Sequence, residues 1–167
     1  MILTLRQNQV DIIDRVRRAF SKGIKGVCVV FPTGGGKTVI FCFITKAVLS
    51  KGNSVIILVH RRELILQISS HLDFLGIVHG IIAPGFPMTD HKVQTASVQT
   101  LKNRIESVPV PNLVIIDECQ HVAAKTWENI LSYWTKTAPD CGNRHEGGSA
   151  DDLRPAALKA EPCISSE

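Results

Sequence analysis

Apolar and polar positions follow a regular order along the first 137 residues of the chain. Short runs that are apolar throughout are typical of strands buried on both faces of a sheet. Such runs occupy 27–31, 54–59 and 113–117, and weaker strand patterns occupy 77–82 and 93–97. Segments with helical spacing lie around them, at 4–22, 37–51, 62–75, 98–104 and 122–135. This alternation predicts an α/β domain with a mostly parallel sheet flanked by helices.

The start of the first helix carries a local signature. Thr4 and Gln7 fit a capping box, in which the Thr4 hydroxyl caps the helix and the Gln7 side chain reaches back. The sequence therefore predicts that this helix begins directly after Thr4.

Composition narrows the class of protein without naming a function. The chain has 167 residues, of which 44% are hydrophobic and 20% charged, and these values are ordinary for one globular domain. Its net charge of +4 favours anionic partners only weakly. The five cysteines form no C-x-x-C pair, which argues against a zinc site and favours a reducing, cytoplasmic setting. No apolar run approaches the roughly 18–20 residues of a membrane span, so we expect no membrane partner.

A glycine-rich turn stands where the strand at 27–31 gives way to a helix. Its residues are Thr33, Gly34, Gly35, Gly36, Lys37 and Thr38. Glycines let backbone N–H groups converge on phosphates, a lysine reaches the β- and γ-phosphates, and a threonine hydroxyl ligates Mg²⁺. The strict pattern G-x-x-x-x-G-K-[ST] has glycine at its first position, where this chain has Phe31. The strand–turn–helix context still favours a phosphate-binding loop over an incidental flexible turn.

Two adjacent carboxylates, Asp117 and Glu118, directly follow four apolar residues at 113–116. Charges at the end of a buried strand are hard to explain by packing, because desolvation disfavours them. Asp117 is predicted to hold Mg²⁺ through water, and Glu118 to orient and deprotonate an attacking water. The alternative is a strand that ends in a solvated acidic turn.

Several motifs in order resemble the first RecA-like domain of superfamily 2 helicases of the DEAD/DEAH-box type, bacterial or phage. PTGGGKT is similar to motif I, and Asp117-Glu118-Cys119-Gln120 stands where the D-E-x-x box belongs. LRQNQ at 5–9 is similar to the element that precedes motif I. The resemblance covers residues 2–136 and implies a RecA-like P-loop NTPase fold that binds ATP and Mg²⁺.

The resemblance also implies roles for further residues. By this resemblance, Gln9 would recognise adenine, and Arg6 would assist it. The alternative is that these residues only form a polar first turn of the helix. Nucleic-acid contacts fall to His60, Arg61, Arg62, Gln99 and Thr100, and DNA is favoured over RNA. A solvated basic turn and ordinary helix capping are the alternatives for these two groups. Gln120 or His121 would couple the nucleotide to the nucleic acid, unless His121 only decorates the next helix.

Residues 138–167 depart from the pattern of the domain at 1–137. They are rich in Gly, Pro, Asp and Ser and keep no sustained period. One interpretation is a disordered natural tail. The other is a reading-frame shift, because codons for the residues after Gly142, read one nucleotide later, are compatible with G-T-A-T-K, which resembles the family's motif III.

The function implied is that of an ATP-binding and nucleic-acid-binding motor domain of an ATP-dependent helicase or translocase. The second RecA-like domain expected in an intact family protein, with its arginine finger, is absent, so hydrolysis by this chain should be weak or absent. The alternatives are a catalytically inactive binding module, the motor fragment of a restriction-modification enzyme, and a gene remnant.

Overall fold

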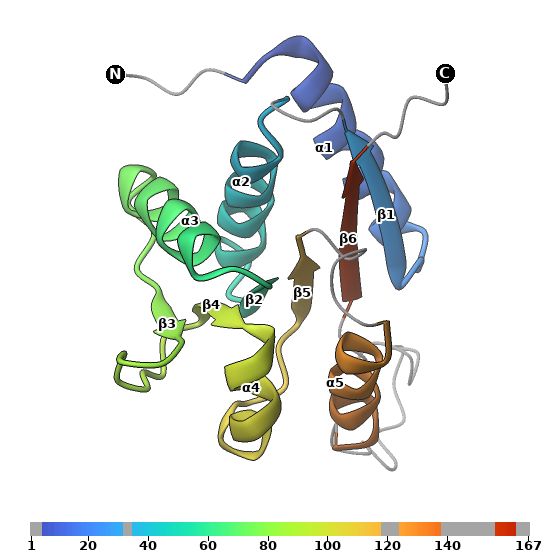
Figure 1. Ribbon diagram of the computed structural model, residues 1–167. Helices are drawn as coiled ribbons and strands as arrows, with labels where there is room; N and C mark the ends of the chain where they lie inside the picture. Colours follow the sequence, from blue (N-terminus) through green and yellow to red (C-terminus); the bar gives the residue numbers. More distant parts are fainter. Residues whose placement is uncertain (1–4, 32–34, 118–123, 138–155, 163–167) are drawn as a thin grey trace, which may run out of the picture.

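The structure is a computed structural model that describes residues 5–31, 35–117, 124–137 and 156–162 (Figure 1). The helices are α1 (Gln7–Ser21), α2 (Lys37–Leu49), α3 (Arg62–Phe74), α4 (Val98–Arg104) and α5 (Ala124–Thr137), with a 3₁₀ turn at Ile105–Ser107. The strands are β1 (Gly26–Phe31), β2 (Val55–Val59), β3 (Gly80–Ile82), β4 (Val93–Ser97), β5 (Leu113–Ile116) and β6 (Ala156–Pro162).

One six-stranded sheet, in the order β1-β6-β5-β2-β4-β3, organises the described residues. Every neighbouring pair in it is parallel. Parallel strands need crossover connections, and helices α2 and α3 supply two of them. The predicted α/β class with a parallel sheet is confirmed.

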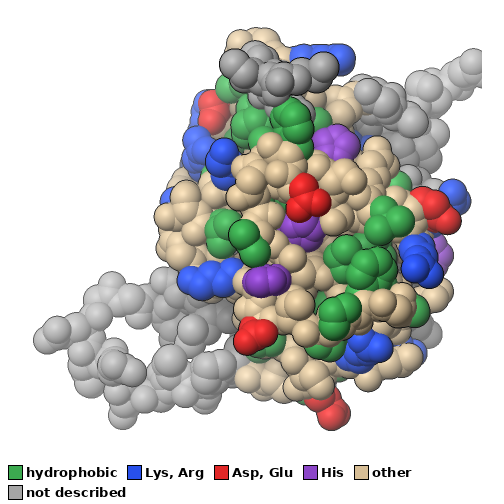
Figure 2. Space-filling view, turned by 90° about the vertical axis from the view of Figure 1, so that its left-hand side faces the viewer, with side chains coloured by type: hydrophobic (Ala, Val, Ile, Leu, Met, Phe, Trp, Pro, Cys, Tyr) green, Lys and Arg blue, Asp and Glu red, His purple; other side chains and the backbone are tan. Residues whose placement is uncertain are grey.

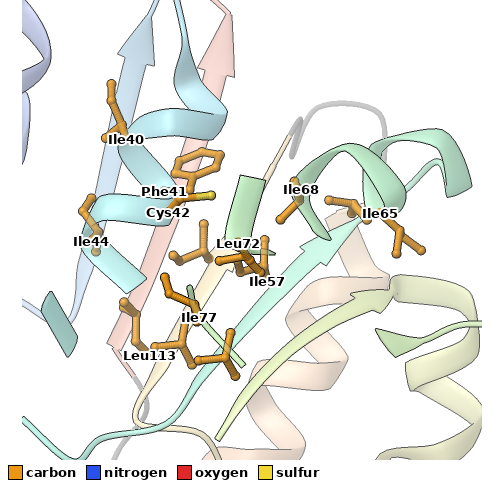
Figure 3. Close-up of a cluster of buried hydrophobic side chains, with 14 of the residues drawn as sticks. Ile40, Phe41, Cys42, Ile44, Ile57, Ile65, Ile68, Leu72, Ile77 and Leu113 are labelled. Atoms are coloured by element: carbon orange, nitrogen blue, oxygen red, sulfur yellow. The ribbon is translucent and has the colours of Figure 1, made fainter. Parts of the chain in front are cut away.

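Helices cover both faces of the sheet, and β2 shows how the faces are divided. Val55, Ile57 and Val59 belong to one hydrophobic cluster, whereas Ile56 and Leu58 belong to another. The first cluster, part of which Figure 3 draws, takes buried residues from α1, α2 and α3. The second takes them from α4 and α5. Each fully buried Ile or Leu stabilises the fold by about 1.5–3 kcal/mol, so both layers contribute to the stability of the sheet.

Strand β6 differs from the sequence-based expectation for the tail. Ala156–Pro162 pairs with β1 on one side and with β5 on the other, with Ala157 opposite both Gly26 and Val114. The sequence shows no sustained period in 138–167, whereas the structure has these seven residues as a strand. The frameshift interpretation stays a prediction.

A buried histidine ties the end of α3 to β3. The His79 Nδ1 lies 2.9 Å from the Ile77 carbonyl oxygen, and its Nε2 lies 2.7 Å from the Ser69 Oγ. A carbonyl only accepts, so Nδ1 donates to the Ile77 carbonyl, while Nε2 pairs with the Ser69 hydroxyl. This contact fixes α3, whose first turn carries the arginines considered below.

Figure 2 views the side on which α3 and β3 lie, where small groups of hydrophobic side chains stand between charged ones. Among the described helices, none has the length and apolar character that a membrane crossing requires.

Candidate functional site

The described residues predicted to bind ligands gather at one edge of the sheet. Parallel strands end together, so the segments after β1, β5, β2 and β4 all meet at their carboxyl ends. In open α/β sheets, ligands bind in the crevice at this edge. Residues at this edge include Gly35, Gly36, Lys37, Thr38, His60, Arg61, Arg62, Gln99, Thr100 and Asp117. Thr33, Gly34, Glu118, Gln120 and His121 lie outside the described residues.

Gly36 opens α2 in a conformation that favours glycine. Its φ is +86°, in the left-handed region, and it occupies the position before Lys37, the first helical residue. A Cβ at Gly36 would lie 2.6 Å from the Gln9 Nε2, so a side chain would fill this space. No carboxylate lies in the first turn of α2, and Lys37 and Thr38 are both half-buried. The first-turn N–H groups and the lysine therefore favour an anion here.

Gln9 joins the start of α1 to this turn. The Gln9 Oε1 accepts from the Arg6 N–H at 2.9 Å, and the Gln9 Nε2 donates to the Gly35 carbonyl at 3.2 Å. Gln9 is only 5% exposed. The helix begins at Gln7 with Arg6 as its N-cap, so Gln9, and not Gln7, makes the return contact of the capping box. Both ends of the Gln9 amide are thus engaged within the protein.

This contact predicts a stability cost for Gln9→Glu. The carboxylate would keep the contact to the Arg6 N–H but would place an oxygen against the Gly35 carbonyl, so two acceptors would face each other. We expect a loss of about 1–2 kcal/mol in the free energy of unfolding, measured by urea titration without nucleotide. Asn8→Asp, which also turns an amide into a carboxylate but at an exposed position of the same helix, is the matched control. Equal stability of the two variants would contradict the role of this contact.

Asp117 lies directly after β5 and is buried, with 6% of its surface exposed. Its N–H donates to the Leu58 carbonyl at 3.0 Å, which continues the β5–β2 pairing by one residue and fixes the backbone of the carboxylate. One strand, β6, stands between β5 and β1. Two strand spacings amount to about 10 Å, so Asp117 and the turn before Lys37 face a common space across β6.

Among the described residues, no group of three His, Cys, Asp or Glu side chains could hold a metal ion. A magnesium ion at this edge would therefore take most of its ligands from water and phosphate oxygens, as Mg²⁺ commonly does. Among the described residues at this edge, the Thr38 hydroxyl and the Asp117 carboxylate offer oxygens of the kind that Mg²⁺ takes.

The basic segment after β2 and the polar segment after β4 are neighbours, because Val59 pairs with Ser97. Arg61 and Arg62 are exposed, and His60 is half-buried. Within the described part of the chain, the His60 Nδ1 is buried without a hydrogen-bond partner. Gln99 is exposed and Thr100 half-buried, in the first turn of α4. These two segments present donors side by side at one edge.

Two features of this edge escaped the sequence patterns. The Gln9–Gly35 contact joins residues far apart in the chain, and no local signal predicts it. The Cζ of Arg62 lies 5.9 Å from the ring centroid of Phe86. The Pro-Gly pair before Phe86 indicates a turn in the sequence. The sequence does not indicate which arginine the Phe86 ring contacts.

Burial raises the pKa of the Cys42 thiol, on α2, to about 12. The thiol therefore stays protonated at neutral pH and packs as a small apolar group in the first hydrophobic cluster. Cys42 has no chemical part in the site.

The sequence matches the family described as "Type III restriction enzyme, res subunit" over residues 2–138. It is 37% identical over 103 residues to a 51.5 kDa protein of a Lactococcus phage (isolate 7-9), a match covering 62% of this chain and 20% of the phage protein. It is 36% identical over 143 residues to the "Putative ATP-dependent helicase IRC3" of Saccharomyces cerevisiae, covering 78% of this chain and 21% of that protein. The chain thus spans about a fifth of the curated relatives it matches.

A solved structure with a similar fold is the Sulfolobus solfataricus SWI2/SNF2 ATPase core in complex with dsDNA. The TM-score is 0.65 at 16% sequence identity, and the match covers 94% of this chain and 31% of that one. At this identity the likeness concerns the fold alone.

Proposed function

Because the chain belongs to the type III restriction enzyme res subunit family, we propose that it is the nucleotide-binding motor segment of an ATP-dependent helicase or translocase. Its relation to the N-terminal RecA-like domain of superfamily 2 helicases, predicted from the motifs, is confirmed. One observation carries the proposal: the glycine turn before Lys37 and the buried Asp117 share one edge of the sheet, with a single strand between them.

ATP is the proposed ligand of this edge. The backbone N–H groups around Gly35 and Gly36 would hold the β- and γ-phosphates, and the Lys37 ammonium would neutralise their charge. Thr38 and Asp117 would hold Mg²⁺, which neutralises charge that develops on the phosphate oxygens. Thr33 and Gly34 complete the proposed turn, and Glu118 is proposed as the base. Adenine reading by Gln9, with Arg6 assisting, requires the Gln9 amide to exchange one of its present partners for the base.

Nucleic acid is the proposed partner of the neighbouring segments. His60, Arg61 and Arg62 would contact backbone phosphates, and Gln99 and Thr100 would donate further hydrogen bonds from the next strand end. We favour DNA over RNA because the SWI2/SNF2 ATPase core of similar fold is described in complex with dsDNA. Gln120 or His121 is proposed to couple these nucleic-acid contacts to the bound nucleotide.

A complete motor requires a second RecA-like domain, which we propose as the partner that completes the nucleotide cleft. Without an arginine from that domain, transition-state stabilisation is incomplete, so this chain should bind ATP and hydrolyse it slowly. The family description favours one specific form of this function, in which the chain is the motor of a restriction-modification enzyme. A cytoplasmic, reducing location remains part of this proposal, on the cysteine pattern of the sequence alone.

An ATPase assay with and without single-stranded DNA, double-stranded DNA and RNA tests the proposal. We expect Mg²⁺-dependent ATP binding and turnover far below the roughly 1–10³ s⁻¹ of typical enzymes. Turnover at the rate of a full two-domain motor would contradict the predicted weakness. Failure to bind nucleotide at all would overturn the proposed function, and binding without any turnover would favour the inactive binding module.

A further inference from the structure

The loop after β3 holds Phe86 in a fixed place. Ala83, Pro84, Gly85 and Phe86 form a β-turn in which the Phe86 N–H donates to the Ala83 carbonyl at 3.2 Å. Proline at the second position and a φ of +85° at Gly85 are typical of a type II turn. Pro87 then restricts Phe86 to extended backbone. The sequence A-P-G-F-P therefore leaves this phenylalanine little conformational freedom.

The Phe86 ring is anchored on one side and meets a cation on the other. Phe86 is half-buried and packs against the first hydrophobic cluster, which α3 also covers. The Arg62 Cζ lies 5.9 Å from the ring centroid, within the range in which the face of an aromatic ring attracts a guanidinium. Arg61 has no ring of this kind beside it in the described part of the chain. Phe86 therefore restrains one particular arginine.

Stacking restrains the Arg62 guanidinium without using its hydrogen-bond donors. The five N–H groups of arginine lie in the plane of the group, whereas a ring covers only its face. The Arg62 side chain is exposed, and it makes no ion pair with any carboxylate among the described residues. Its donors therefore remain available to a ligand that approaches the carboxyl edge of the sheet.

We infer that Phe86 is a positioning residue for nucleic acid: it holds the Arg62 fork ready for two-pronged binding of a backbone phosphate. The inference rests on the proposed nucleic-acid contact and adds the residue that orients it. A pre-oriented side chain loses less rotamer freedom on binding, so Phe86 increases affinity without touching the strand.

The test measures binding of fluorescein-labelled oligothymidine to the full chain by anisotropy at several salt concentrations. We expect Phe86→Leu to weaken binding about 2–5-fold, because binding must then restrict the rotamers of one free arginine side chain. The slope of log affinity against log salt should not change, because the number of neutralised phosphates is the same. Phe86→Trp should bind like the wild type, and Phe74→Leu, at an exposed phenylalanine of α3, is the matched control.

Arg62→Ala should weaken binding and reduce the salt slope by about one. In the Arg62→Ala background, Phe86→Leu should have no further effect, because the ring then has no guanidinium to orient. A further loss in that background, failure of Phe86→Trp to bind like the wild type, or an unchanged affinity of Phe86→Leu would overturn the inference while the nucleic-acid contact stands. If the wild-type chain does not bind oligothymidine, the proposed contact itself fails, and the inference with it.

The midpoint of urea unfolding is measured for every variant, so that weaker binding caused by loss of the folded structure is recognised. If Phe86→Leu does not fold, Arg62→Lys carries the test, because it keeps the charge and loses the planar fork. We then expect a similar 2–5-fold weakening at an unchanged salt slope. Wild-type affinity of Arg62→Lys would overturn the inference.

Discussion

We expect Lys37→Ala to weaken ATP binding by about 100-fold. Lys37 is the first residue of α2, half-buried, and follows the left-handed Gly36 at the carboxyl edge of the sheet. Loss of one ammonium shared by two phosphates removes charge-assisted hydrogen bonds worth about 3 kcal/mol, which corresponds to that factor. Titration with a fluorescent ATP analogue in the presence of Mg²⁺ measures the change.

Lys46→Ala is the matched control for this experiment. Lys46 is an exposed lysine in the last turn of the same helix, so the variant removes an identical charge far from the turn. Its nucleotide affinity should equal that of the wild type, and both variants should keep the wild-type circular dichroism spectrum. Unchanged affinity of Lys37→Ala would refute the phosphate-binding turn.

We expect Asp117→Asn to remove most of the magnesium dependence of ATP binding. A carboxylate that holds Mg²⁺ through water typically contributes about 10–100-fold to metal affinity, and a neutral amide does not replace it. The measurement is the ratio of nucleotide affinities in Mg²⁺ and in EDTA, which should fall towards one in Asp117→Asn. This readout does not depend on turnover, so it serves even if the chain hydrolyses ATP slowly.

Asp90→Asn controls for the loss of one negative charge. Asp90 is exposed and precedes the amino end of β4, at the opposite edge of the sheet from Asp117. The wild-type ratio should persist in this variant. A wild-type ratio in Asp117→Asn as well would show that this carboxylate does not serve a metal.

The elements that the sequence predicts well are those in which one local pattern suffices. β2 is five apolar residues that the structure buries completely, and α2 is a helix bounded by Gly36. Because most of the predicted strands are followed by a helix, the alternation predicts the parallel sheet and its ligand edge. The same alternation suffices to bring Lys37 and Asp117 to one edge, since each directly follows the carboxyl end of a predicted strand or its turn.

The start of α1 shows where local reasoning stops. Thr4 and Gln7 fit the capping pattern, which has Ser or Thr at the cap, whereas Arg6 and Gln9 share with it only the glutamine at the same spacing. The contact of the Gln9 Nε2 with the Gly35 carbonyl belongs to the arrangement that the structure adopts, and it depends on tertiary packing that no helix signature contains.

The sequence patterns did not predict strand β6, for a related reason. Its sequence, AALKAEP, includes a lysine, a glutamate and a proline and carries little of the β-branched or aromatic character of strands. The segment is a strand because it lies between two partners that present unpaired backbone groups, β1 and β5. Pairing of this kind is a property of the sheet and cannot be read from seven residues alone.

The central position of β6 also bears on how the protein is made. Synthesis delivers β1 first and β6 last, so the strand that spaces the two halves of the ligand edge leaves the ribosome after everything it joins. Contacts between distant parts of a chain form slowly, because loop closure must precede them. A nascent chain therefore carries the turn before Lys37 for some time before that turn faces Asp117, and the proposed nucleotide site would be completed late in folding.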